Sequence, residues 1–550
     1  MAETKLPDTI SSFGDFLRSS VDGPGTNALF GSNVWNIRNY STLTPLYLII
    51  SLWLIYSTGL AAYRLTLSPI AKIPGPKIAA VTFWYEMYYD IWLGGTYYRK
   101  IDEMHKKYGP IVRINPYEVH LNDPDFIDSV FPGPGRQTDK YFFTGRRTGT
   151  QNSIVATIDH DMHRKRRNTI TNFFSNASIR RLEPVMKEHI NTLLSRMQGA
   201  GTKEQVLPMH FVFRACTSDL ITQYAFGESF HFLEQEDFSM PYMESTDVFF
   251  KLNHTFCHFP WVGTLLASAP PWAIKTFIPS LTEMWDKAAM WIERVDEVRN
   301  SPNPEKIKTT IFEGVLSSKL PDEEKTNLRL AHEAQLVVFA GEGTTAYTLQ
   351  SALFQLLANP KEFEKVKEEI NAAIPYSDSL PSFSEVESLP YLNAVIQETI
   401  RIHPGVVSRL PRVSPKTPTL YHDKKNDKEY IIPAGTSTNM TAQIAHMNAD
   451  VFENPYEFRP QRWIDNPRLD KAFIGFARGT RNCIGMNFAR LEMSLVLAAI
   501  IQKYDIYRGQ GGPTLELFDT LRERDIDLNH DYIIPFPAKG SPGLRVKIRN

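Results

Sequence analysis

A long uncharged segment near the N-terminus is the feature that most constrains this chain. No charged residue lies between Arg38 and Arg64, and residues 43–63 are mostly apolar. About twenty such residues are enough for a helix to cross a bilayer. A helix buried in a folded core is the alternative, whereas a cleavable signal peptide would begin earlier and be shorter. The sequence therefore predicts one transmembrane helix over residues 42–63.

The charges on either side of this segment predict its orientation. Arg64, Lys72 and Lys77 follow it closely, whereas Arg38 is the main positive charge just before it. Positively charged residues next to a membrane helix favour the cytosolic side. We therefore expect residues 1–41 in the lumen of the endoplasmic reticulum and the remainder in the cytosol, anchored by a single pass.

Proline residues separate the anchor from the rest of the chain. Pro69, Pro74 and Pro76 prevent a continuous helix, so we expect residues 64–77 to form a stiff hinge. No repeat and no linker is recognisable further along the chain. Residues 78–550 are therefore expected to form one domain.

Composition excludes several classes of protein. The 60 Lys and Arg residues balance the 61 Asp and Glu residues, so we expect no nucleic acid partner. Three cysteines, Cys216, Cys257 and Cys483, cannot form a disulfide framework. This scarcity is typical of a reduced, cytosol-facing protein. We expect Cys216 and Cys257 to be small buried hydrophobic residues.

The sequence pattern is mainly helical with a small β region. The longest helix is expected over residues 327–358, where Asn359-Pro360 ends it. A second helix is expected over residues 384–402, and a β-hairpin over residues 420–432. Residues 447–482 have no regular pattern and lead to a cysteine. Loops of this length usually have a function.

That cysteine lies in the segment of residues 476–485, which reads Phe-Ala-Arg-Gly-Thr-Arg-Asn-Cys-Ile-Gly. Two glycines allow a tight turn in which backbone N–H groups point at the sulfur and favour a thiolate. The pattern F-x-x-G-x-R-x-C-x-G resembles the haem-binding loop of cytochrome P450. This resemblance implies that Cys483 is the axial thiolate ligand of the iron of haem b. It also implies that Phe476 shields the sulfur and that Arg481 contacts a haem propionate.

Two further motifs resemble the same family. Glu398 and Arg401 match its ExxR motif, and their spacing places both side chains on one helix face. Arg462 lies in a Pro-x-Arg-Trp element that would complete a structural network with them. Taken alone, an ExxR sequence is usually a surface ion pair. In order with the cysteine loop, the three residues are expected to support the haem face.

A basic segment offers contacts for the haem propionates. His163 and Arg167 occupy the place of the family's W-x-x-x-R motif, with histidine in place of tryptophan. The resemblance implies that both hold a propionate, and Arg412 is a further candidate for that contact. A solvated basic helix face and a nuclear localisation signal over residues 164–167 are the alternatives.

Residues 340–345, Ala-Gly-Glu-Gly-Thr-Thr, resemble the oxygen-activating motif of the family. There, an acid and the first threonine manage protons for bound dioxygen, so Thr344 is the expected hydrogen-bond donor. The acid position is occupied by Gly343, and Glu342 stands one residue early, about 100° away around a helix. Protons are expected to arrive through water or through Glu342 re-aimed by a π-bulge. Gly341 and Gly343 are expected to admit a ligand close to the helix.

The resemblance implies a haem-thiolate monooxygenase that inserts one atom of O₂ into an apolar substrate. Electrons would come from NADPH through a separate NADPH–cytochrome P450 reductase, with cytochrome b5 as a second candidate donor, because no flavin or nicotinamide domain is recognisable. Residues 156–175 are similar to fungal trichodiene oxygenase-like P450s, which implies terpenoid or polyketide substrates in mycotoxin-type secondary metabolism.

Two alternatives remain. One is a haem-thiolate isomerase or dehydratase that needs no O₂ activation, and the other is a non-catalytic membrane haem-binding protein. By resemblance, substrate contacts are expected just before Ala340, over residues 406–410 and over residues 533–537.

Overall fold

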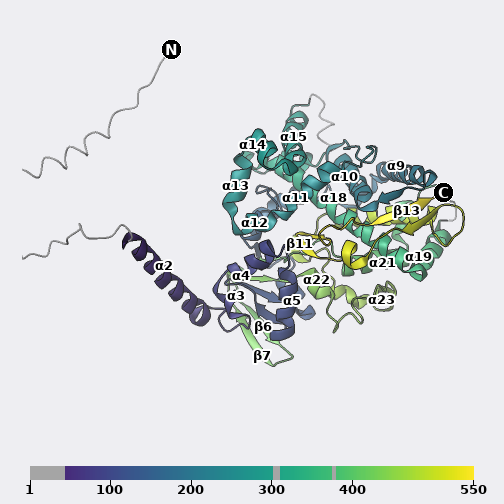
Figure 1. Cartoon of the computed structure of the whole chain (residues 1–550). Helices are drawn as coiled ribbons and strands as arrows, with labels where there is room; N and C mark the ends of the chain where they lie inside the picture. The colour runs from purple at the N-terminus through teal and green to yellow at the C-terminus, as the bar shows by residue number, and fades with distance from the viewer. Residues whose placement is uncertain (1–43, 302–309, 375–378) are drawn as a thin grey trace, which may run out of the picture. The chain divides into compact units, whose positions relative to one another are not determined.

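The computed structural model describes residues 44–301, 310–374 and 379–550 (Figure 1). Residues 1–41, for which a lumenal position was predicted, lie outside them. The apolar segment forms the helix α2 (Thr44–Ala62), and none of its residues is buried. Residues 44–66 are long and apolar enough to cross a membrane. The prediction of one apolar N-terminal helix is confirmed.

The chain divides into two compact units, residues 1–59 and residues 60–550. The second unit is mainly helical, as predicted. Its α-helices are α3 (Lys77–Val81), α4 (Trp84–Met87), α5 (Tyr97–Tyr108), α6 (Ile127–Val130), α7 (His160–Thr171), α8 (Asn176–Arg180), α9 (Glu183–Thr202), α10 (Met209–Phe226), α11 (Met240–Lys251), α12 (Asn253–His258), α13 (Pro260–Ser268), α14 (Pro271–Phe277), α15 (Thr282–Arg299), α17 (Phe312–Leu316), α18 (Asn327–Ala358), α19 (Pro360–Ala373), α20 (Phe383–Glu387), α21 (Pro390–Ile402), α22 (Ala442–His446), α23 (Gln461–Asp465) and α24 (Met486–Lys503).

The strands form small sheets. The largest has the order β1 (Ile111–Arg113), β2 (Glu118–Leu121), β8 (Ser437–Asn439), β5 (Arg412–Val413) and β3 (Asp139–Lys140), and only its β2–β8 pair is parallel. A second sheet has the order β4 (Val206–Pro208), β13 (Arg545–Arg549), β10 (Thr514–Leu517) and β9 (Asp505–Ile506). Two further antiparallel pairs are β11 (His530–Tyr532) with β12 (Ile534–Phe536), and β6 (Thr419–Asp423) with β7 (Lys428–Ile432).

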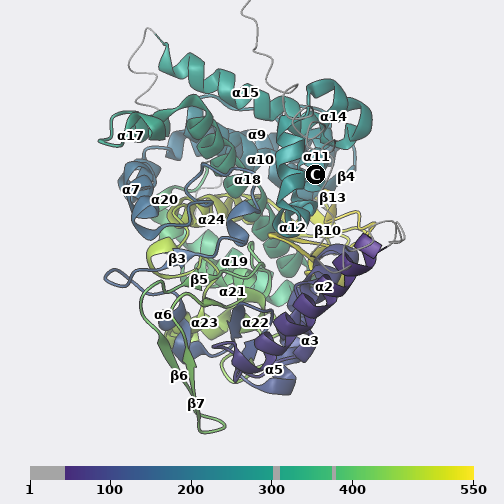
Figure 2. The same ribbon diagram turned by 90° about the vertical axis from the view of Figure 1, so that its left-hand side faces the viewer.

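The predicted hairpin over residues 420–432 is confirmed as the β6–β7 pair. Thr419 pairs with Ile432 and Asp423 with Lys428, so a short polar turn joins the strands. The hairpin projects from the edge of the second unit in both views (Figures 1 and 2).

The longest helix, α18, has the predicted ends and passes through the core. The Thr326 hydroxyl caps its N-terminus by accepting the backbone N–H of Arg329 at 3.3 Å. Asn359, whose backbone is non-helical (φ −126°, ψ 76°) before Pro360, ends it. Buried apolar residues of α18 pack with α10, α15, α21 and α24 in one hydrophobic core.

The helix predicted over residues 384–402 is wrong as a single element. The structure has two helices there, α20 and α21, separated by Ser388 and Leu389. Pro390 is the reason, because a proline disfavours helical geometry in the residue before it and lacks the N–H that a helix interior needs. It fits well as the first residue of α21.

Candidate functional site

A loop before α24 presents Cys483 to an internal cavity. The loop contains the 3₁₀ turn Gly479–Arg481. Gly479 has a φ of +71°, and a Cβ there would lie 2.4 Å from the carbonyl oxygen of Pro132, so only glycine fits this turn. The backbone N–H of Cys483 donates to the carbonyl oxygen of Phe476 at 2.9 Å. The Cys483 thiol opens only onto this internal cavity, which it lines, and protein surrounds it otherwise.

The middle of α18 forms a second wall of this cavity. Although most of α18 is buried, Ala340 is exposed and Thr344, one turn later, is half-buried. Both residues line the cavity. The Thr344 hydroxyl donates to the carbonyl oxygen of Ala340 at 2.7 Å, which leaves lone pairs on Oγ1 as acceptors. The exposed face of α18 and Cys483 therefore border the same space.

The two glycines of α18 differ in what surrounds them. A Cβ at Gly341 would lie 2.7 Å from Cγ1 of Ile221 on α10. A Cβ at Gly343 would meet only Cδ1 of Ile534, at an ordinary 3.4 Å. Gly341 is thus needed for close helix packing, and it also lines the cavity, so its expected role toward a ligand stays a prediction.

Glu342 is directed toward neighbouring helices. Its Oε1 accepts from Arg214 Nη2 at 2.8 Å and from Arg214 Nε at 3.1 Å. Arg214, on α10, also pairs with Asp247 on α11 at 2.8 Å. Glu342 is buried and is not among the residues that line the cavity. Because α18 runs as one α-helix without a π-bulge between Asn327 and Ala358, nothing re-aims this carboxylate.

Cationic side chains line a further part of the cavity. They are Lys140, Arg147, Arg167, Arg409, Arg412 and Arg481. Among the described residues, only Arg409 of this set has a carboxylate within 4 Å. Charges buried without an opposite partner are costly. The cavity wall therefore favours an anionic ligand.

Backbone and amide oxygens hold several of these cations in place. Arg167 donates to both the carbonyl and the side-chain oxygen of Asn482 at 2.8 Å. Arg481 donates to the carbonyl oxygens of Thr157 at 2.7 Å and Ile158 at 2.6 Å. Both arginines are thereby fixed beside the cysteine loop.

The pKa values of this group are lowered by burial and by the positive charges of neighbouring members. Burial, together with the charges of Arg412 and Arg481, lowers the pKa of Lys140 to about 7. Burial also lowers the pKa of Arg412 to about 9. His163 is buried on the same wall, and burial together with the charges of Arg481 and Arg167 lowers its pKa to about 3. His163 is therefore neutral at physiological pH.

A separate charge network lies beneath the loop. Both oxygens of Glu398 accept from Arg401, each at 2.8 Å. Oε1 also accepts from Arg462 Nε at 3.0 Å, and Oε2 accepts from the Trp463 indole N–H at 2.9 Å. Glu398 and Arg401 are fully buried. The structure thus brings together the three residues predicted from the sequence and adds Trp463.

His446 links this network to the cysteine loop. Arg401 donates to the carbonyl oxygen of His446 at 3.0 Å, and Nε2 of His446 accepts the backbone N–H of Ile474 at 2.9 Å. Burial, together with the charge of Arg401, lowers the pKa of His446 to about 3. A neutral imidazole can accept at Nε2. Its ring stacks on Phe473, with centroids 5.1 Å apart. No sequence signal distinguished this histidine.

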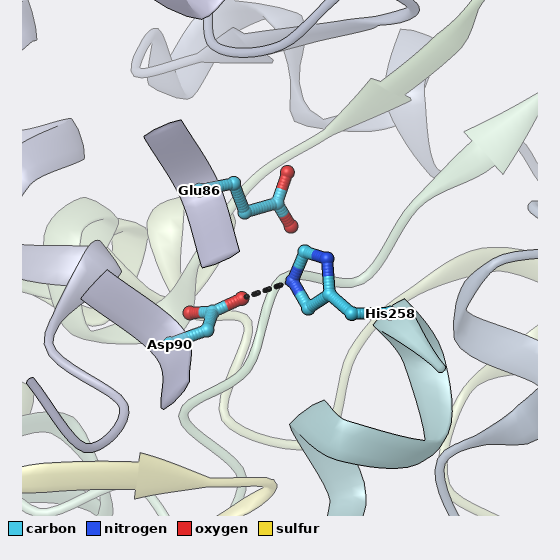
Figure 3. Close-up of side chains that lie close together, drawn as sticks. All are labelled: Glu86, Asp90 and His258. Atoms are coloured by element: carbon cyan, nitrogen blue, oxygen red, sulfur yellow. Dashed lines mark ion pairs between the residues drawn. The ribbon is translucent and has the colours of Figure 1, made fainter. Parts of the chain in front are cut away.

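Another buried cluster contains Glu86, Asp90 and His258, which come from α4, η3 (Tyr88–Trp92) and α12 and point toward one another (Figure 3). Nε2 of His258 lies 3.5 Å from Oδ2 of Asp90. Three such ligands could hold a metal ion, but both oxygens of Glu86 are already used. One accepts from Arg409 and the other from Asn115. We interpret the cluster as a charge network that fixes Arg409.

Comparison with known proteins decides the family. The family described as cytochrome P450 matches residues 74–520. The chain belongs to the cytochrome P450 family. This P450 is 36% identical over 501 residues to cytochrome P450 monooxygenase tpcC of Cochliobolus heterostrophus, covering 90% of this chain and 95% of that one. It is 35% identical over 512 residues to N-acetyltryptophan 6-hydroxylase ivoC of Emericella nidulans, covering 91% and 97%. It is 34% identical over 524 residues to tryptophan 6-hydroxylase fscE of Fusarium equiseti, covering 94% and 99%.

These relatives confirm the predicted resemblance to fungal secondary-metabolism P450s and the enzyme class, a P450 monooxygenase. The predicted fold class, mainly α with a small β region, is confirmed as well. Membership of the family implies a thiolate-ligated haem.

The cavity of this P450 fits such a group. Haem carries two propionate carboxylates, and this wall offers cations that have no carboxylate partner among the residues that the structure describes. Burial raises the pKa of the Cys483 thiol, and the backbone N–H of Gly485 and the charge of Arg167 oppose that rise. The sequence predicts that the turn favours a thiolate. In the structure, the turn alone does not offset the effect of burial on the thiol. Metal coordination deprotonates a thiol outright.

Sequence reasoning missed two cations of this P450's cavity, Lys140 and Arg147, and included Arg409 only within a range of expected substrate contacts. Lys140 lines the cavity in β3 and pairs with Arg412 of β5 in the sheet. No motif marked it, because a single lysine in a loop-rich segment has no distinctive pattern. Its nearness to Arg412 comes only from the pairing of strands that are far apart in the sequence.

Proposed function

We propose that this P450 is a membrane-anchored monooxygenase that inserts one atom of O₂ into an apolar substrate. The observation that carries the proposal is that the Cys483 thiol and the Thr344 hydroxyl line one cavity. An isomerase, a dehydratase or a non-catalytic haem-binding protein would not need the Thr344 hydroxyl on the face of α18 that borders the cavity.

The residues that would hold haem follow from the cavity wall. Cys483 would ligate the iron, and Phe476, which packs in the same loop, would shield the sulfur. Arg481, Arg412 and Lys140 would pair with the propionates, with His163 and Arg167 beside them. When bound, a thiolate-ligated haem supplies the electron density that favours O–O cleavage.

Thr344 would hold a proton at Oγ1 on the substrate side of α18. Its hydroxyl already donates to Ala340 at 2.7 Å, so turning it toward the cavity exchanges one hydrogen bond for another. Gly343 supplies no acid, and the carboxylate of Glu342 is held by Arg214. We therefore infer that water brings protons to Thr344.

The proton role of Thr344 is tested by coupling. We expect Thr344→Ala to lower product formed per NADPH consumed, because a positioned proton donor commonly contributes on the order of 10²-fold or more to a proton-transfer step. Thr344→Ser, which keeps the hydroxyl, should retain coupling. Unchanged product per NADPH in Thr344→Ala would contradict the role.

The substrate is expected to be largely apolar. Phe250, Phe339 and Ile534 line the cavity, drawn from the segments where substrate contacts were predicted and from α11. Terpenoid and polyketide scaffolds of mycotoxin-type pathways remain our proposal. Two relatives are named for hydroxylation of tryptophan or N-acetyltryptophan, so an aromatic acid belongs to the range that should be assayed.

The electron supply and location complete the proposal. NADPH–cytochrome P450 reductase would deliver electrons, with cytochrome b5 as an additional donor. The apolar helix α2 supports an anchor in the endoplasmic reticulum membrane, with residues 1–41 lumenal, residues 64–77 as a hinge and residues 78–550 cytosolic.

A reduced carbon monoxide difference spectrum tests the central claim. We expect the wild-type protein to show the band of a thiolate-ligated haem and Cys483→Ala to lose it. Survival of the band in Cys483→Ala would overturn the assignment of the ligand. Cys216→Ala is the matched control, because that buried thiol should have no effect on the band.

NADPH dependence separates the rival activities. Turnover of a terpenoid and aromatic-acid panel should require NADPH and reductase. Conversion without them would indicate an isomerase or dehydratase, and a normal band without any turnover would favour a haem-binding protein.

A further inference from the structure

Arg147 is a buried cation with unused hydrogen-bond donors in the cavity wall. It follows the 3₁₀ turn η5 (Thr144–Arg146) and is 7% exposed. Its Nη1 donates to the carbonyl oxygen of Arg409 over 3.4 Å, and its charge opposes the rise in pKa that burial causes in the Cys257 thiol. Its Nε is buried and has no hydrogen-bond partner within the described ranges of the chain. A guanidinium has five N–H donors, so this arginine can still bind an acceptor.

The nearby carboxylates are already engaged by other groups. Glu86 accepts from Arg409 and Asn115, and Glu118 accepts from Asn115 at 2.7 Å and from Asn439 at 2.9 Å. Within the described part of the chain, no carboxylate lies within 4 Å of Arg147. Arg147 therefore differs from its neighbour Arg409, which the protein itself pairs.

Arg147 also differs from the cations beside the cysteine loop. Arg167 and Arg481 are fixed to the backbone of that region, whereas Arg147 lies near enough to Cys257 of α12 for its charge to act on that thiol. Two residues further on, a Cβ at Gly149 would meet the Phe249 ring on α11 at 2.6 Å. This part of the wall therefore belongs to the α11–α12 side.

Aromatic rings accompany Arg147 on this side. Phe250 of α11 and Phe339 of α18 both line the cavity, and their ring centroids are 5.5 Å apart. Ser408 lines the same cavity but donates to Asp531. The site thus combines an apolar surface with one planar, fixed fork of donors, which matches the geometry of a carboxylate.

We propose that Arg147 binds a carboxylate of the substrate, so that the enzyme acts on an apolar acid. This inference rests on the proposed function, because it names the substrate class of the same cavity. Haem propionates are the other source of a carboxylate, and the experiment below separates the two.

The test compares a carboxylic acid with its neutral amide. Full-length holoenzyme in lipid nanodiscs is titrated with indole-3-propionic acid and with indole-3-propionamide, and binding is followed by the haem absorbance shift and by calorimetry. Loss of a charge-assisted hydrogen bond changes affinity on the order of ten- to a hundred-fold. We expect the wild type to prefer the acid by that factor and Arg147→Met to bind both probes alike.

Arg412→Met is the matched control. It removes a cation from the same cavity, and we expect it to release haem faster while keeping the preference for the acid. Arg147→Met should release haem at the wild-type rate. Should Arg147→Met fail to fold, Arg147→Gln, which keeps donors without charge, must still reduce the preference.

Two outcomes would overturn the inference. One is equal affinity of the wild type for acid and amide. The other is an Arg147→Met variant that keeps the preference for the acid; rapid loss of haem from that variant would in addition assign Arg147 to a propionate. Failure of the proposed function is distinct, because it appears as a missing thiolate band in the wild type, while calorimetry still reports on Arg147.

Discussion

Two buried groups of charges differ in whether the protein supplies both signs. Around Glu398, one carboxylate accepts from Arg401, Arg462 and Trp463, and every partner comes from the chain. Around the cavity, cations such as Arg412 and Lys140 have no carboxylate within 4 Å among the described residues. We call the first group closed, because its charges are paired within the protein, and the second open, because its cations have no carboxylate partner among the described residues.

The difference indicates what each group is for. Buried ions cost several kcal/mol each to desolvate, and the cost is offset only by well-placed opposite charges and hydrogen bonds. A closed network therefore holds segments of the chain together, here α21, α23 and the segment before the cysteine loop. An open group keeps that cost until an anion binds, so it marks a ligand site.

The largest expected effect comes from breaking the closed network. Glu398→Gln would leave Arg401 and Arg462 buried without an anion, which costs about 3–5 kcal/mol. We expect little folded, haem-loaded protein, measured as the yield of the carbon monoxide band relative to total chain.

An exposed pair provides the control for this prediction. Glu387, on α20, pairs with Arg180, and both side chains are about half exposed (55% and 48%). Glu387→Gln should cost less than about 1 kcal/mol. Normal haem loading in Glu398→Gln would show that the closed network is not structural.

Removing one cation from the second group should weaken haem binding and leave the fold intact. Arg412→Met removes a buried cation whose hydrogen bond goes to the carbonyl oxygen of Pro411. Because no protein anion is left unpaired, we expect the free energy of unfolding to change little. Haem release should become faster by on the order of ten-fold or more, as for loss of one charge-assisted hydrogen bond.

Transfer of haem to an excess of a haem-free globin measures that rate. Lys424→Met, at an exposed cation outside the cavity, should release haem as the wild type does. Loss of folded protein in Arg412→Met, at the level of Glu398→Gln, would remove the distinction between the two groups.

Sequence reasoning succeeded where the determinant is local. The ends of α18 follow from the Thr326 cap and from Pro360, and the cysteine loop follows from its own spacing. The single helix over residues 384–402 failed because the apolar pattern continues across Pro390, although the backbone does not.

The rest of the site depends on contacts between distant segments. Arg214 lies 128 residues before Glu342, and His446 lies 45 residues after Arg401. No pattern in one sequence indicates such pairs. For the same reason, the sequence does not indicate that Arg147 lacks a carboxylate partner among the described residues. That follows only from the positions of the neighbouring carboxylates and of the groups that they bind.

The smallest expected effect tests whether a paired charge on α18 can also be catalytic. Glu342 lies two residues before Thr344, but its carboxylate is held by Arg214. Since Arg214 keeps its 2.8 Å pair with Asp247, Glu342→Gln should cost about 1–3 kcal/mol and leave product per NADPH unchanged. Asp247→Asn is the matched control, because it removes the other carboxylate, on α11, that pairs with the Arg214 guanidinium. If Glu342→Gln lowers coupling as Thr344→Ala does, while Asp247→Asn does not, Glu342 delivers protons and a closed pair is no proof of a purely structural role.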